Sequence, residues 1–67
     1  MDIDERRKVV SRYLRRCVTY SDASIARKQS REEDSSEIAR WQAFREFTAF
    51  SASEMESGAL DTWLTDE

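Results

Sequence analysis

Apolar side chains recur every three or four residues along much of the chain, which is the period of an amphipathic α-helix. Over residues 2–29, seven uncharged positions fall on one side of a helical wheel: Ile3, Val10, Tyr13, Leu14, Cys17, Ser21 and Ile25. Asp2 and Asp4 put negative charge at the helix N-terminus, where the helix dipole favours it. We therefore predict a first helix at about residues 2–29. The stripe weakens after Val18, so the pattern also allows a break near residue 21.

A polar stretch at about residues 30–34 interrupts the apolar pattern and predicts a turn. Asp34 is followed three residues later by Glu37, which is the spacing of a capping box at a helix N-terminus. A second helix is expected at about residues 35–57, with Gly58 at the position of a C-cap glycine. The sequence contains no proline and one glycine, which favours long helices over strands and tight turns.

The last segment, residues 59–65, carries the large apolar side chains of Leu60, Trp63 and Leu64. We predict a short helical segment that folds back onto the two long helices, because a disordered tail would leave Trp63 and Leu64 in water. The fold class is then all-α: a helical hairpin with a short C-terminal helical segment, forming one small domain over residues 1–67.

The second helix carries more apolar surface than one neighbouring helix can cover. Its large side chains are spaced by three: Ile38, Trp41, Phe44, Phe47 and Phe50. Each step of three turns the apolar direction by roughly 60°, whereas a facing helix covers only about a third of the circumference. This helix is therefore predicted to lie between the first helix and the C-terminal segment, and also to face another molecule. Dimerisation or docking on a larger protein would complete a helical bundle.

Length and composition favour the same conclusion. A single core in a chain of 67 residues supplies only a few kcal/mol, so small domains usually add a disulfide, a metal or an oligomeric interface. Cys17 is the one cysteine and there is no histidine, so an internal disulfide and the usual nitrogen ligand of zinc are excluded. We therefore expect a homodimer, whose interface would add the stability that a single small core lacks. The halves also carry opposite charge, +4 for residues 1–30 and -7 for residues 31–67, within a net charge of -3.

The residue types argue against an enzyme, and we expect no cofactor and no metal. Without histidine the commonest general base is missing. Cys17 falls on the apolar stripe, which favours a buried small side chain over a nucleophile. The single thiol fits a reducing cytoplasm, and the apolar runs are far shorter than the roughly 20 residues of a membrane span.

A nucleic-acid-binding regulator is the alternative function. Four basic side chains fall on the polar side of the first helix and could follow phosphates: Lys8, Arg12, Arg15 and Arg16. Residues 24–28 followed by residues 36–41 also resemble the two helices of a helix-turn-helix. The intervening turn, however, is acidic and lacks the usual glycine of that motif.

The favoured function is a small non-catalytic regulatory or accessory protein that acts by protein–protein interaction, as an inhibitor, an adaptor or an antitoxin-like protein. Its partner would be another protein, a second copy of itself, or both. Tryptophan is enriched at the energetic centres of interfaces, and large apolar side chains are available in the second half of the chain. The candidate interaction residues are Trp41, Phe44, Phe47, Phe50, Trp63 and Leu64.

Overall fold

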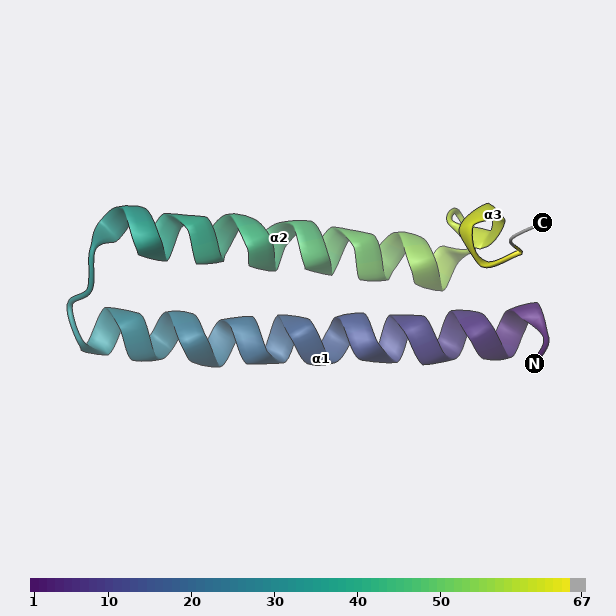
Figure 1. Cartoon of the computed structure of the whole chain (residues 1–67), viewed down its shortest axis with the longest axis horizontal. Helices are drawn as coiled ribbons and strands as arrows, with labels where there is room; N and C mark the ends of the chain where they lie inside the picture. Colours follow the sequence, from purple (N-terminus) through teal and green to yellow (C-terminus); the bar gives the residue numbers. More distant parts are fainter. Residues whose placement is uncertain (66–67) are drawn as a thin grey trace.

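Two long antiparallel helices and one short helix form an elongated hairpin (Figure 1). The computed structural model describes residues 1–65, in which α1 spans Ile3–Ser30, α2 spans Ser35–Ser57 and α3 spans Asp61–Leu64. The chain measures 45 × 18 × 15 Å along its principal axes. The described part contains no strand, so the predicted all-α hairpin with a short C-terminal helix is confirmed. The start of α1 and the short α3 lie at the same end of the rod.

The first helix is continuous over Ile3–Ser30, so the prediction of a possible break near residue 21 is wrong. Ser21 is fully buried, and its hydroxyl donates a hydrogen bond to the Cys17 carbonyl oxygen at 2.8 Å. The weak apolar stripe therefore marks a close helix contact rather than a helix end. At the start of α1, Asp2 is the N-cap and accepts from the Glu5 backbone N–H at 2.8 Å, while the Glu5 side chain accepts from the Asp2 backbone.

The predicted ends of the second helix are also confirmed. Asp34 is the N-cap of α2 and accepts a hydrogen bond from the Ser36 backbone N–H at 3.2 Å. Gly58 is the C-cap with φ of 90°, a left-handed conformation that glycine adopts without steric cost. The Glu37 carboxylate does not complete the capping box. It lies 3.7 Å from Lys28 Nζ, so it joins the two helices across the turn instead.

Small and hydroxyl-bearing side chains fill the contact between α1 and α2, which we call the seam. Within residues 1–65, the buried side chains are Ser11, Val18, Ser21, Ser24, Thr48, Ala52 and Met55. The positions of α2 that turn toward α1 alternate in spacing between three and four: Ile38, Trp41, Arg45, Thr48, Ala52 and Met55. That alternation averages 3.5 residues, the period of a coiled coil. The seam thus brings the helices close together while burying little apolar area.

The hydroxyl groups of the seam are satisfied within their own helices. Thr48 donates to the Phe44 carbonyl oxygen at 2.7 Å, and Ser11 donates to the Lys8 carbonyl oxygen at 3.2 Å. Among the described residues, no buried side-chain nitrogen or oxygen lacks a hydrogen-bond partner. Because an unsatisfied buried polar group would cost about 1–3 kcal/mol, these local bonds make a polar seam tolerable.

Charged contacts fix α3 against the N-terminal end of α1. The Arg7 guanidinium donates to both carboxylate oxygens of Asp61, at 3.1 and 2.6 Å, and Arg6 donates to the Leu64 carbonyl oxygen at 2.6 Å. This position leaves the aromatic side chains of α2 without the cover expected from the C-terminal segment. Trp63 is itself 74% exposed, so the prediction that the segment buries its tryptophan is wrong.

Overpacking the seam should destabilise the fold. Ala52 is fully buried between the helices, and a leucine there would force them apart, which typically costs about 1–3 kcal/mol. Urea unfolding at fixed protein concentration should show this loss for Ala52→Leu. The exposed Ala43 offers the matched control, and Ala43→Leu should change the free energy of unfolding by less than about 0.5 kcal/mol. Equal effects at both positions would contradict the seam.

The ion pairs make stability depend on acid pH. Hydrogen bonds from Arg7 hold the pKa of Asp61 below its ordinary 3.8, and those from Arg15 hold the pKa of Glu56 below its ordinary 4.5. The unfolded chain then binds more protons than the folded chain in this range. The stabilisation is therefore complete above the ordinary values and is lost as the pH falls through the lowered ones.

Urea unfolding at pH 6 and pH 3 measures this contribution. Asp61→Asn should make the difference in stability between the two pH values smaller than in the parent protein. Glu46→Gln is the control, because Glu46 is exposed and forms no ion pair within the described residues. A pH dependence unchanged by Asp61→Asn would show that the Arg7–Asp61 contact is absent in solution.

Candidate functional site

Large aromatic side chains of both helices lie on one side of the hairpin. We call this surface the aromatic face and define it by Tyr13, Cys17 and Tyr20 of α1 and Trp41, Phe44 and Phe47 of α2. Tyr13 and Tyr20 are seven residues apart, two helical turns, so they project in nearly the same direction. Phe44 and Phe47 are 48% and 72% exposed. Within one chain, therefore, most of this apolar surface remains in contact with water.

Trp41 anchors the aromatic face by contacts to both helices. Its ring centroid lies 5.9 Å from that of Tyr20 at an interplanar angle of 57°, and 5.9 Å from that of Phe44 at 79°. Tilted and edge-to-face pairs at this separation are favourable because the ring edge is positive and the ring face negative. Lys28 Nζ lies 5.7 Å from the Trp41 centroid, a cation–π contact. These contacts hold the centre of the face in a fixed geometry.

Two shallow hollows flank Phe44. One, of about 240 Å³, is lined by Arg16, Cys17, Tyr20, Trp41 and Phe44. The other, of about 310 Å³, is lined by Glu37, Arg40, Trp41 and Phe44. Both are open to solvent and small; Trp41 and Phe44 line both, and charged side chains border each of them. They suit side chains of a protein surface better than an enclosed small molecule, because ligand pockets bury most of the ligand surface.

The opposite side of the hairpin is closed by ion pairs. Arg15 contacts both Glu56 carboxylate oxygens, at 3.0 and 2.8 Å, and Arg45 Nε donates to Asp22 at 2.8 Å. Asp22 follows Tyr20 by two residues, so the two side chains point about 160° apart on α1. The hairpin therefore has a polar side with ion pairs between its helices and an aromatic side that no other element within residues 1–65 covers.

The remaining predicted interaction residues lie outside the aromatic face. Phe50 is 64% exposed and projects from α2 roughly 60° further round the helix than Phe47. Trp63 and Leu64 belong to α3 at the end of the rod, where the Leu64 carbonyl oxygen accepts the bond from Arg6. The structure thus brings Trp41 and Phe44 into contact, and Phe47 follows Phe44 by three residues on α2, roughly 60° further round the helix.

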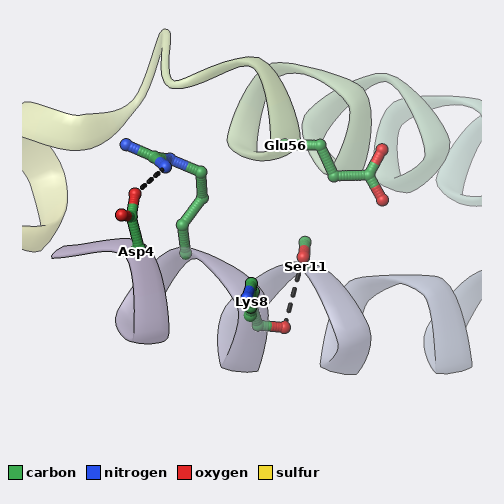
Figure 2. A pocket seen from close by; sticks show the side chains of 5 residues that line it. Asp4, Lys8, Ser11 and Glu56 are labelled. Carbon is green, nitrogen blue, oxygen red and sulfur yellow. Dashed lines mark hydrogen bonds and ion pairs between the residues drawn. The ribbon is translucent and has the colours of Figure 1, made fainter. Parts of the chain in front are cut away.

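The four predicted nucleic-acid residues do not form one free basic patch. Arg15 is held by Glu56, whose hydrogen bonds raise the pKa of the Arg15 guanidinium above its ordinary value. Lys8 borders a hollow of about 310 Å³ that also contains Asp4, Arg7, Ser11 and Glu56, so its surroundings carry both signs of charge (Figure 2). Figure 2 shows Asp4, Lys8 and Ser11 on one helix and Glu56 on the facing helix. The Arg7 guanidinium also lines this hollow and donates a hydrogen bond to Asp4 at 2.6 Å.

Arg12 and Arg16 remain available on the outer side of α1. With Val9 and Tyr13 they line a hollow of about 210 Å³, and neither forms an ion pair within the described residues. The described part of the chain holds no group of three or more cysteine or carboxylate side chains placed to bind a metal ion. No helix in that part is both long enough and apolar enough to cross a membrane.

Sequence reasoning missed the contribution of α1 to the aromatic face. The helical wheel places Tyr13 on the same side as Val10 and Leu14, yet Tyr13 is 66% exposed, and Tyr20, which lies outside that set, packs on Trp41. The seven-residue separation of the two tyrosines was the available signal, because it places both on one side of a helix.

Comparison of the chain with protein-family models, with curated proteins and with solved structures gave no match.

Proposed function

We propose that this chain is a small non-catalytic regulatory or accessory protein that acts by binding protein at the aromatic face. The observation that carries the proposal is that the largest apolar side chains lie on the surface while smaller ones are buried. Within residues 1–65 the buried apolar side chains are Val18, Ala52 and Met55, whereas Phe44 and Phe47 stay exposed beside them. A contiguous exposed apolar patch with a polar surround is typical of a protein-interaction site.

The chemistry of the face fits protein recognition. Trp41 is fixed by contacts from both helices, which reduces the entropy lost when a partner binds. Tryptophan, tyrosine and arginine dominate binding hot spots, and Trp41, Tyr20 and Arg16 border the same hollow. Inhibitor, adaptor and antitoxin-like roles all belong to this class. The unpaired Cys17 thiol supports action in a reducing compartment such as the cytoplasm.

Site-specific photocrosslinking tests the proposal. A photoreactive phenylalanine analogue at position 47 should form covalent adducts with a bound protein when the chain is produced in its own cells. The control position is Gln42, exposed on α2 and turned about 140° away from Phe47. Adducts are expected from position 47 and not from position 42. The same yield from both positions, or no adduct from either, would refute the proposal.

Nucleic-acid binding remains the second candidate, on the observation that Arg12, Tyr13 and Arg16 line one hollow on α1. Two unpaired guanidinium groups beside an aromatic ring could contact a phosphate backbone and a base.

The matching test leaves Arg15 in place because it bonds to Glu56. If the second candidate is correct, Arg12→Gln combined with Arg16→Gln should weaken binding to duplex DNA or RNA and lower the salt slope by about 2. Arg31→Gln, in the turn at the far end of the rod, should leave binding unchanged. No binding by the parent protein, or equal binding by the double variant, would exclude this function.

A further inference from the structure

The chain exposes more surface than its size requires. Its accessible area is 5018 Å², whereas a compact protein of this mass exposes about 4400 Å². The excess, about 600 Å², approaches the roughly 800 Å² that each partner contributes to a standard protein interface. A two-helix rod has a single layer, so one further layer of similar length laid on the aromatic face would bury the excess.

A second hairpin of the same kind has the right shape for that layer. The aromatic face carries aromatic side chains along both helices, and the seam already has coiled-coil spacing, which is the geometry of four-helix bundles. With a two-fold axis parallel to the helices, α1 of one copy lies opposite α2 of the other, antiparallel and at the same height. Within each hairpin the Arg45–Asp22 contact places residue 22 of α1 level with residue 45 of α2, and therefore Tyr20 level with Phe47. In the two-fold arrangement Tyr20 would then contact Phe47 of the second copy.

Charge selects this arrangement over one with like helices face to face. The N-terminal part of the chain carries +4 and the C-terminal part -7, so placing α1 opposite the other copy's α2 joins opposite signs. Arg16 borders the aromatic face, and Glu54 lies seven residues beyond Phe47 on the same side of α2. Neither forms an ion pair within the described residues. In the two-fold arrangement they lie within about one helical turn of each other across the interface.

We propose that the protein bound at the aromatic face is a second copy of this chain, giving an antiparallel four-helix bundle in which Arg16 of each copy pairs with Glu54 of the other. This inference rests on the proposed function, since it names the partner of the same surface. The surface is complementary to a second copy of itself, because one chain carries the aromatic side chains of the interface and both charges of the pair.

Sedimentation equilibrium and light scattering across a range of concentrations test the inference. The parent chain should have twice the monomer mass at micromolar concentration. Phe47→Glu should raise the dimer dissociation constant by about 30-fold or more, as for a hot-spot residue at the centre of an interface. Phe50→Glu is the matched control, since Phe50 points away from the second layer, and its dimer should resemble that of the parent.

A charge-reversal cycle tests the arrangement without altering the aromatic side chains. Arg16→Glu and Glu54→Arg should each weaken the dimer by about fivefold, and the double variant should recover the parent affinity. Far-UV circular dichroism establishes that each variant is still helical. Failure of the double variant to recover, or greater sensitivity to Phe50→Glu than to Phe47→Glu, overturns the proposed arrangement.

The two proposals fail separately. A parent chain that stays monomeric and helical at all concentrations overturns self-association alone, because crosslinks from position 47 to a different protein would still support the proposed function. A monomeric chain that gives no crosslink from position 47 overturns both. Adducts of twice the chain mass from position 47, together with recovery in the charge-reversal cycle, support both.

Discussion

The close approach of α1 and α2 constrains the rest of the molecule. The distance between two packed helices depends on the side chains at their contact, and the seam has small side chains at Ser21, Ser24 and Ala52. Of the aromatic side chains of α2, Trp41 turns toward α1 and packs on Tyr20. Phe44, Phe47 and Phe50 lie at the margin of the contact or outside it, and all three are exposed. The exposed aromatic face follows from the same packing that joins the two helices.

The two sides of the hairpin differ in how their polar and apolar groups are satisfied. On one side, Arg15 and Arg45 reach across to acidic partners on the other helix, so the charges are neutralised within a single chain. On the other side, Tyr20, Trp41 and Phe44 contact one another, but the outward surfaces of the rings remain in water. Only the second side gains substantially from contact with another molecule, because burying aromatic surface is favourable whereas exposed ion pairs contribute little.

The helices could be predicted from the sequence because their signals are local. Asp2, Asp34 and Gly58 lie at or next to the helix ends where capping residues belong, and each adopts its capping role. The direction in which α2 presents its side chains was harder to predict, because two periods overlap in it. The run from Trp41 to Phe50 repeats every three residues, while the positions that face α1 alternate between three and four. Choosing between these periods requires knowing which positions of α2 are buried against α1, and that is a property of the packed pair of helices and not of α2 alone.

Tertiary charge pairing explains the error at the C-terminal segment. Burial of Trp63 was expected because apolar side chains avoid water, but Asp61 binds Arg7 and thereby determines where the whole of α3 lies. In a helix of four residues, one fixed side chain leaves its neighbours little choice of direction. A long-range ion pair of this kind, between residues 54 positions apart, has no signature in the local sequence.

A smooth seam also affects how the two helices are aligned along their length. Five of the seven buried side chains of residues 1–65 are serine, threonine or alanine, which form only shallow projections, so the buried contacts resist sliding of one helix along the other less than a seam of large side chains would. The alignment is held by ion pairs between the two helices, Arg45 with Asp22 and, toward the open end of the hairpin, Arg15 with Glu56. Both contacts are electrostatic and are screened as ionic strength rises. Salt therefore acts on the alignment of the aromatic rings of α1 and α2, although none of those rings carries a charge.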